Sequence, residues 1–176
     1  HEEVHVTTVL VTHDQEEALS MADRIAVMNK GRIEQVASPT EIYDHPATLF
    51  VNQFVGTTNL IPGKILESGP NGSEIEYAGG TLRAAPVQLR KGLDVLVSIR
   101  PEQLHVQNGA ADNGIAGTVK MVMPLGPHVV YDVEIAGGTA VKISQARESS
   151  TAMIDRGSAI RFAPLSSAAC HVFPMQ

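Results

Sequence analysis

Lys91-Gly92-Leu93-Asp94-Val95-Leu96-Val97 recurs further along the chain as Arg156-Gly157-Ser158-Ala159-Ile160-Arg161-Phe162. In both copies a glycine precedes alternating apolar residues, which is the pattern of a turn followed by a half-buried strand. Val97 in the first copy corresponds to Phe162 in the second, so the inward-facing positions are apolar in both. The stretch therefore predicts one strand that is used twice in a β domain.

Other segments recur around this stretch in the same order. The matching pairs are Gly63-Lys64-Ile65 with Gly117-Thr118-Val119, Ala78-Gly79-Gly80-Thr81 with Ala136-Gly137-Gly138-Thr139, and His105-Val106 with His171-Val172. Two copies predict a tandem pair, since a solenoid needs at least three. We expect two β units, about residues 60–107 and 114–174, that together close one small barrel-like domain. Residues 108–113 are the expected joint.

The character of the chain changes at Gly56-Thr57-Thr58-Asn59, which is expected to be a linker. After it, short alternating strands are separated by clusters of Gly, Asn and Pro, which favours an all-β barrel or sandwich. Before it, helical and strand patterns alternate. We therefore predict a mainly β chain with two domains, residues 1–56 of α/β character and residues 57–176 of β character.

The first domain is predicted to contain several short elements. In chain order these are a buried strand at residues 8–11, a helix over 15–22 opened by an Asp14/Glu17 capping box, a strand at 24–28, a turn at 29–31, a hairpin strand at 32–37, a helix opened by Ser38-Pro39, and a helix opened by Pro46 and ended by Gly56. Half an α/β layer leaves strands without partners. We expect residues 1–37 to pair with a second copy or to be poorly ordered.

His13 follows the predicted strand at residues 8–11 and precedes the predicted helix. In open α/β sheets ligands bind outside the carboxyl ends of the strands, and a helix N-terminus favours an anion. His13 is therefore a candidate for contact with a phosphate. The alternative, which geometry alone favours, is a histidine that only hydrogen-bonds within a turn.

Composition excludes several classes of function. The 176 residues include 13 basic and 19 acidic ones, a net charge of −6, and only 4% aromatics, so a nucleic-acid partner is not expected. Cys170 is the single cysteine, which excludes an internal disulfide and a Cys-based zinc site. The seven histidines show no His-x3-His spacing on a predicted helix, so a metal site is not expected, although His1 and His5 could chelate weakly if that end is helical. No apolar run approaches the roughly 18 residues of a membrane span.

Catalytic motifs are also lacking. The chain has no Gly-x4-Gly-Lys-Ser/Thr loop and no Gly-x-Ser-x-Gly elbow. Arg100-Pro101-Glu102 is the densest polar feature of the β region, and we interpret it as a structural corner or salt bridge. His1 stands where an initiator Met would, with no signal-peptide pattern after it, so the chain is expected to have been cut or processed.

Val11-Thr12-His13-Asp14-Gln15-Glu16-Glu17-Ala18 resembles the switch-histidine segment of ATP-binding-cassette (ABC) import ATPases. The resemblance continues without a gap through residues 22–35, and it extends over residues 38–48 and Phe54-Val55-Gly56. Ser98-Ile99-Arg100-Pro101-Glu102 resembles part of the accessory TOBE domain of the same importers, a tandem oligonucleotide-fold (OB-fold)-like barrel.

The resemblance implies that residues 1–56 are the C-terminal part of an ABC nucleotide-binding domain and that residues 57–176 are a TOBE-like regulatory domain. His13 would contact the γ-phosphate and orient the hydrolytic geometry. The complete protein would use ATP and Mg²⁺, whereas this fragment is expected to bind neither. The phosphate loop, the signature motif and the general base of the family are not in this sequence, so the chain alone should not hydrolyse ATP.

The resemblance also implies partners and a location. The complete protein would join transmembrane permease subunits at the cytoplasmic face of the bacterial inner membrane, as a homodimer through its cassette and accessory domains. A periplasmic or extracellular solute-binding protein would act indirectly. Residues 56–63 lean towards the polyamine or iron type of importer. The alternative hypothesis is a free-standing β module that binds small ligands such as oxyanions.

Overall fold

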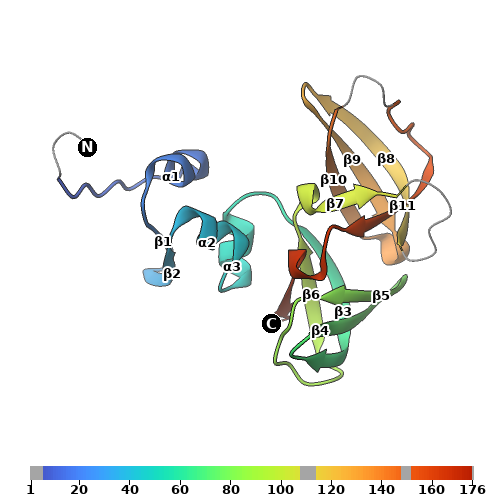
Figure 1. The fold of residues 1–176 in the computed structure, drawn as a ribbon, viewed down its shortest axis with the longest axis horizontal. Helices are drawn as coiled ribbons and strands as arrows, with labels where there is room; N and C mark the ends of the chain where they lie inside the picture. The colour runs from blue at the N-terminus through green and yellow to red at the C-terminus, as the bar shows by residue number, and fades with distance from the viewer. Residues whose placement is uncertain (1–5, 108–113, 148–151, 176) are drawn as a thin grey trace. The chain divides into compact units, whose positions relative to one another are not determined.

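The computed structural model describes residues 6–107, 114–147 and 152–175. The chain divides into two compact units, His1–Gly56 and Thr57–Gln176, called unit 1 and unit 2 (Figure 1). The predicted joint at residues 108–113 lies outside the described residues. Within the described ranges, no helix is both long enough and apolar enough to cross a membrane.

Unit 1 consists of short helices around one hairpin. Its described elements are α1 (Gln15–Met21), β1 (Ile25–Asn29), β2 (Arg32–Ala37), α2 (Pro39–Asp44) and α3 (Leu49–Phe54). β1 and β2 pair antiparallel, as predicted. The turn between them places Lys30 at φ 47° and Gly31 at φ 76°, the two positive values that a type I′ hairpin turn needs.

The helix ends of unit 1 follow the capping signals in most places. Ser38 accepts a hydrogen bond from the Glu41 amide at the start of α2, and Gly56 has φ 82° after α3, as predicted. The predicted start of the last helix at Pro46 was wrong. Thr48 caps α3 instead, by accepting from the Val51 amide at 3.2 Å, so that the helix begins at Leu49.

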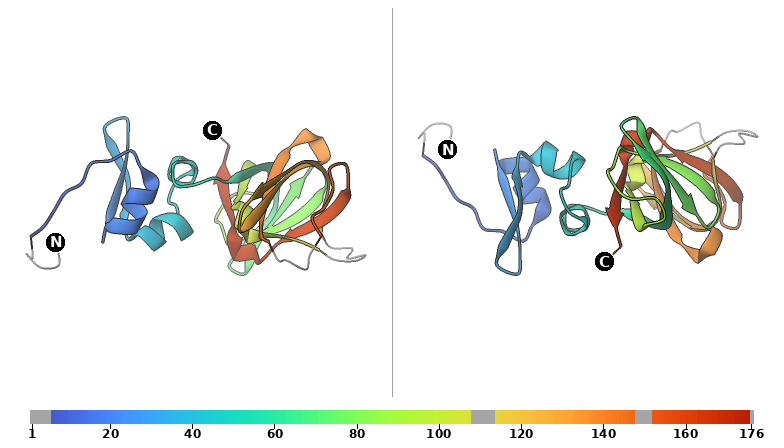
Figure 2. Two further views of the ribbon diagram at one scale, coloured as in Figure 1. Left: turned by 90° about the horizontal axis from the view of Figure 1, so that it is seen from above. Right: turned by 90° about the horizontal axis from the view of Figure 1, so that it is seen from below.

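The predicted buried strand at residues 8–11 was also wrong. No strand is assigned between residues 6 and 12, and the side chains of Val9 and Val11 are 84% and 92% exposed. A strand needs a neighbouring strand for its backbone hydrogen bonds, and β1 and β2 pair with each other. Figure 2 shows this segment leading away from α1. Its apolar side chains are therefore uncovered.

Unit 2 is built from strands. Its described elements are β3 (Asn59–Gly69), β4 (Gly72–Tyr77), β5 (Gly80–Ala84), β6 (Asp94–Ile99), η1 (Pro101–Gln103), β7 (Leu104–Val106), β8 (Ile115–Leu125), β9 (His128–Ile135), η2 (Ala136–Gly138), β10 (Ala140–Ala146), β11 (Ala159–Pro164), η3 (Ser167–Ala169) and β12 (Cys170–Pro174). The described strands form two open five-stranded sheets, β12-β6-β3-β4-β5 and β10-β9-β8-β11-β7. The predicted fold class, a mainly β chain with tandem OB-like units behind an α/β segment, is confirmed.

Each half of unit 2 gives its last strand to the other half. β7 follows the first half in sequence but pairs with β11, and β12 follows the second half but pairs with β6. One hydrophobic core spans both sheets, from Ile61 in β3 to Phe162 in β11. The two halves are therefore not separate barrels, and the sequence repeats did not reveal the exchange.

Matching backbone hydrogen bonds occur in the two halves of unit 2. The Gly92 amide donates to the carbonyl of Ile65 at 2.8 Å, and the Gly157 amide donates to the carbonyl of Val119 at 2.8 Å. Register shifts follow at the same place in both hairpins, between Ile65 and Glu67 and between Val119 and Met121.

Asn59 links the two sheets at the start of β3. Its side-chain Nδ2 donates to the backbone carbonyl of Lys142 in β10 at 2.8 Å, and its Oδ1 accepts from the backbone amide of Lys142 at 2.7 Å. The side chain is buried, at 4% exposure. Because buried polar groups are costly without partners, this reciprocal pair fixes where β10 lies against the first sheet.

Gly63 and Gly117 occupy equivalent places at close crossings. A Cβ on Gly63 would lie 2.7 Å from the carbonyl oxygen of Glu76, and a Cβ on Gly117 would lie 3.0 Å from that of Glu134. Backbone atoms of a paired strand cannot move aside as a side-chain end can. Both positions therefore require glycine.

We expect Gly63→Ala and Gly117→Ala each to lower the free energy of unfolding by about 1–3 kcal/mol, the usual cost of overpacking. Chemical denaturation followed by circular dichroism measures the change. Gly69→Ala is the control, because a Cβ there would meet nothing closer than 3.9 Å. Equal stabilities for all three variants would contradict the close-crossing argument.

Candidate functional site

His13 lies in a tight turn immediately before α1. The Asp14 amide donates to Oγ1 of Thr12 at 3.0 Å, and the Asp14 carboxylate accepts from the Glu17 amide at 3.1 Å. The predicted capping role of Asp14 is thereby confirmed. The Asp14 amide is bonded to the Thr12 hydroxyl, whereas in a complete capping box it would donate to the side chain of Glu17.

Gln15 connects this turn to the end of unit 1. Its side-chain Oε1 accepts from the Gly56 amide at 2.8 Å, across 41 residues of sequence. α1 itself buries no residue. The His13 turn is therefore held by its own short-range bonds, by this one long-range bond and by the packing of Leu19 in α1 against the core of unit 1.

The chemistry available at the turn is limited. The His13 side chain is exposed. Among the residues that the structure describes, no group of three or more His, Cys, Asp and Glu side chains could hold a metal ion. An exposed imidazole can donate to a phosphate oxygen or accept from a water molecule, but hydrolysis needs further groups around the phosphate.

Arg100 has a structural role at a corner of unit 2. It is buried, at 5% exposure, and its Nη1 donates to the carbonyl of Thr57 at 3.2 Å. Pro101 opens the 3-10 turn η1, which leads β6 into the exchanged strand β7. The interpretation of Arg100-Pro101-Glu102 as a structural corner is confirmed.

A hollow of about 570 Å³ lies between the two halves of unit 2 and was not predicted from the sequence. Its lining includes Arg83 and Glu74 from the first sheet and Arg161 and Ser166 from the second half. The repeat contained one signal for this hollow. Arg161 occupies a position where the first copy has the apolar Leu96, so the two copies differ in charge there.

Burial raises the pKa of two side chains in unit 2. It raises the pKa of the Tyr77 phenol, an effect that the positive charge of Arg161 partly offsets. It also raises the pKa of the Cys170 thiol to about 12. Tyr77 lines the hollow beside Arg161, whereas Cys170 is enclosed in the core.

Comparisons with known proteins agree with the resemblance seen in the sequence. The TOBE domain model matches residues 97–173. The spermidine/putrescine import ATP-binding protein PotA of Thermobifida fusca is 38% identical over 164 residues, which cover 90% of this chain and 42% of the relative. The chain matches a C-terminal fragment of an ABC importer ATP-binding subunit, TOBE domain included.

Two further relatives carry different solutes in their names. The sulfate/thiosulfate import ATP-binding protein CysA of Burkholderia mallei is 36% identical, over 99% of this chain and 48% of its own. The Fe(3+) ions import ATP-binding protein FbpC 2 of Rhizobium meliloti is 47% identical, over 64% of this chain and 27% of its own. The chain thus spans less than half the length of these import ATP-binding proteins.

A solved structure has a similar fold over about two thirds of the chain. The molybdate-binding protein ModG matches with a TM-score of 0.57 and 16% identity, and the match covers 66% of this chain and 96% of ModG. At that identity the likeness establishes the fold alone.

The raised pKa of Cys170 leads to a prediction about its reactivity. A neutral, buried thiol is a poor nucleophile, so Cys170 of the folded chain should react with a thiol reagent such as DTNB at pH 8 only after denaturant is added. The pKa of Cys170 in the folded chain exceeds its usual value of 9.0, so the folded chain keeps the thiol proton more tightly than the unfolded chain does. The free energy of unfolding is therefore unaffected by this group below pH 9, and it falls as the pH rises from 9 towards 12. Fast labelling of the native chain would contradict this burial.

Proposed function

We propose that this chain is the C-terminal, regulatory portion of the ATP-hydrolysing subunit of an ABC importer, which in its complete form couples ATP hydrolysis to solute uptake. The observation that carries the proposal is the similarity to import ATP-binding proteins across 90% and 99% of the chain. These matches extend through both units, since unit 1 ends at Gly56. The solute stays open, because the relatives name three different solutes.

In this proposal His13 is the switch histidine that contacts the γ-phosphate of ATP. Its exposure and its place directly before the capped start of α1 support this role, because nothing in the turn blocks its approach to a phosphate. ATP and Mg²⁺ belong to the complete subunit. The groups that bind the other phosphates and the metal would come from sequence that is not part of this chain.

The uncovered residues 6–11 support the same proposal. Val9 and Val11 are almost fully exposed, although their sequence is that of a buried strand. In the complete subunit this segment would pair as a strand within a sheet supplied by further sequence. His13 would then stand at the carboxyl edge of that sheet, where the sequence argument placed it.

The proposed partners and location also follow from the relatives. An import ATP-binding subunit must bind transmembrane permease subunits to couple hydrolysis to movement of the solute. We therefore propose a peripheral position at the cytoplasmic face of the membrane, with a second copy of the subunit and with an external solute-binding protein acting indirectly.

In the complete subunit, His13→Ala should lower the rate of ATP hydrolysis by at least about tenfold, a loss typical of removing one transition-state contact. The affinity for ATP should change little, since other groups hold most of the nucleotide. Phosphate release and binding of a fluorescent ATP analogue measure the two quantities.

His45→Ala is the matched control, because His45 is also an exposed histidine of unit 1 but follows the end of α2. The 176-residue chain alone should show no Mg²⁺-dependent ATP turnover. Unchanged hydrolysis in the His13 variant would remove this residue from the mechanism. Turnover by the chain alone would contradict the proposed division of the active site.

A second candidate function is oxyanion binding by unit 2, as in the fold neighbour ModG, which is a molybdate-binding protein. The hollow lined by Arg83 and Arg161 favours it, because guanidinium groups bind oxyanions well. In this case, calorimetric titration of the chain with molybdate should give saturable heat that Arg161→Gln removes. Arg147→Gln, an exposed arginine outside the hollow, should retain it. Absence of heat would exclude this candidate.

A further inference from the structure

Gln15 makes a hydrogen bond that joins the start of α1 to the last residue of unit 1. Its Oε1 accepts from the Gly56 amide at 2.8 Å, and both residues are partly buried. In a common left-handed ending of a helix, the amide after the C-cap donates to a carbonyl of the last helical turn. At the end of α3 the C-cap is Val55, and the Gly56 amide that follows it donates instead to the Gln15 side chain.

One end of this bond lies close to His13. Gln15 is the first residue of α1, and its N-cap Asp14 is the one residue between it and His13. The hydrogen bonds described for Asp14 go to residues at most four positions away, so they fix the turn only relative to α1. Leu19 packs against the core of unit 1, one turn further along the helix. Among the described residues 12–17, Gln15 is therefore the one whose hydrogen bond reaches a distant part of unit 1.

The other end of the bond adjoins the connection to unit 2. Gly56 is the last residue of unit 1, and Thr57 is the first residue of unit 2. The Thr57 carbonyl accepts from Nη1 of the buried Arg100 at 3.2 Å, and the Thr58 and Ser98 hydroxyl groups lie 2.6 Å apart in a hydrogen bond. Within three consecutive residues, the chain thus passes from a bond with the start of α1 to bonds at the end of β6.

We propose that Gln15 is a positioning residue for His13, through which the connection at Gly56 and Thr57 acts on the His13 turn. While the Gly56 amide is bound, the start of α1 keeps one orientation, and His13 keeps it too. A displacement of Thr57 that draws the Gly56 amide away leaves the turn without its long-range bond. Because a misplacement of about 1 Å can lower a reaction rate about a hundredfold, the loss of this bond slows hydrolysis.

This inference rests on the proposed role of His13 and deepens it. It names the route by which unit 2, as the regulatory part, changes the rate of ATP hydrolysis. Gln15 itself need not contact the nucleotide, since it acts through the orientation of the histidine two residues before it.

Hydrogen exchange of the Gly56 amide in the 176-residue chain, followed by NMR, tests the bond directly. Gln15→Leu removes the acceptor, whereas Gln15→Glu keeps one, because a carboxylate oxygen also accepts. The Gly56 amide should exchange at least about tenfold faster in Gln15→Leu than in the parent chain, and Gln15→Glu should keep most of the protection. The ring-proton signals of His13 should shift or broaden in Gln15→Leu, because its turn is released.

Kinetics of the complete subunit test the positioning role. Gln15→Leu should lower kcat for ATP hydrolysis about tenfold and change KM less than about twofold, since the nucleotide is held by other groups. Gln15→Glu should restore most of kcat. In a His13→Ala background, Gln15→Leu should cause almost no further loss, because a residue that acts through His13 then has nothing to position.

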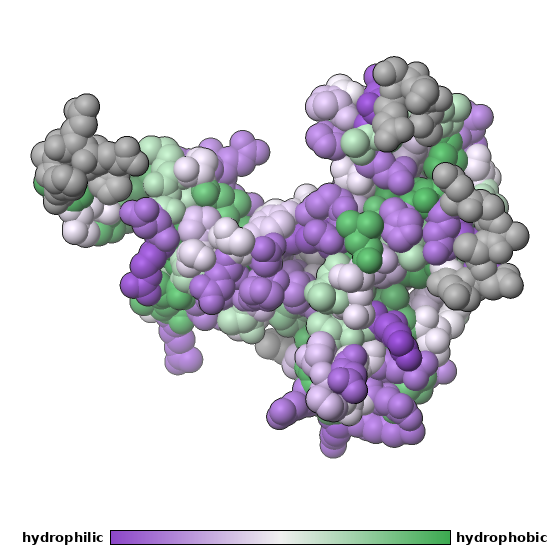
Figure 3. Space-filling model, viewed as in Figure 1, coloured by the Kyte–Doolittle hydropathy of each residue, from purple (hydrophilic) through white to green (hydrophobic). Residues whose placement is uncertain are grey.

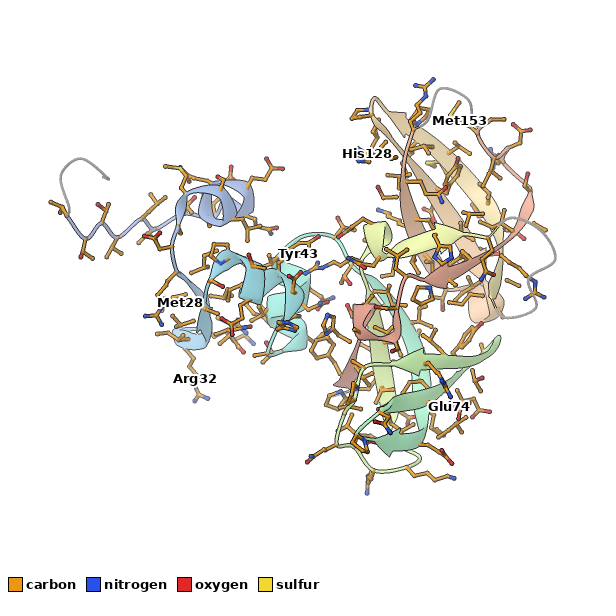
Figure 4. All side chains as sticks on the ribbon, in the orientation of Figure 1. Met28, Arg32, Tyr43, Glu74, His128 and Met153 are labelled. Atoms are coloured by element: carbon orange, nitrogen blue, oxygen red, sulfur yellow. The ribbon has the colours of Figure 1, made fainter. Side chains whose placement is uncertain are left out.

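Two leucine variants in unit 1 are the controls. Gln53 is an exposed glutamine of α3, the helix that ends before Gly56. Figure 4 shows the Arg32 side chain projecting from the β1–β2 hairpin, away from α1. Gln53→Leu and Arg32→Leu should both leave the exchange of the Gly56 amide and kcat at the parent values.

Equal exchange of the Gly56 amide in the parent chain and in Gln15→Leu overturns the proposal. Release of this amide without any change in the His13 signals also overturns it, and so does an undiminished loss of kcat in the His13→Ala background. Failure of the proposed function is read separately, from unchanged hydrolysis in His13→Ala alone. In that case the NMR measurements still decide whether Gln15 positions His13.

Discussion

The fold of unit 2 depends on the pairing of β6 with β12 and of β11 with β7. In each pair, one strand comes from the first half of the sequence and the other from the second. Without these pairs each sheet would lose an outer strand, and the shared core would open along the edges of β6 and β11. The closeness of the two halves follows from this exchange, and so do the constraints on the residues between them.

Within each half, Gly63 lets β3 lie close to the Glu76 carbonyl of β4, and Gly117 lets β8 lie close to the Glu134 carbonyl of β9. Between the halves, the constraint is visible at one residue. Asn59 satisfies both backbone groups of Lys142 and so sets the position of β10. The face of the molecule seen in Figure 3 has hydrophobic residues between hydrophilic ones in both units. Scattered apolar side chains of this kind are normal on a protein surface.

Local signals in the sequence predicted local structure well. The hairpin at β1 and β2, the Ser38 cap and the repeat of Gly92 at Gly157 all depend on a few neighbouring residues, and the structure has each of them. The TOBE and importer relationship was likewise recognised from short motifs. One error came where distant residues decide, since residues 8–11 have the composition of a strand but no described partner. The other error was local, because the Thr48 side chain accepts from the Val51 amide and the helix begins at Leu49 rather than at Pro46.

The candidate sites divide in the same way. His13 and its cap could be found from six consecutive residues, but its role depends on groups beyond this chain, so it stays a prediction. The hollow at Arg83 and Arg161 is assembled from several elements. Only a comparison of the two repeats, position by position, could have indicated that Arg161 replaces Leu96.

The strand exchange also has a consequence for how the chain is made. β12 follows every other described strand in the sequence, yet it completes the sheet that begins with β3. During synthesis the sheet of the first half therefore stays incomplete. The edge of β6 has no partner strand until residues 170–174 have left the ribosome. Such long-range pairing is slow, and an open edge can bind another chain in the meantime. Because β12 is translated after β6, the edge of β6 is covered only when β12 pairs with it.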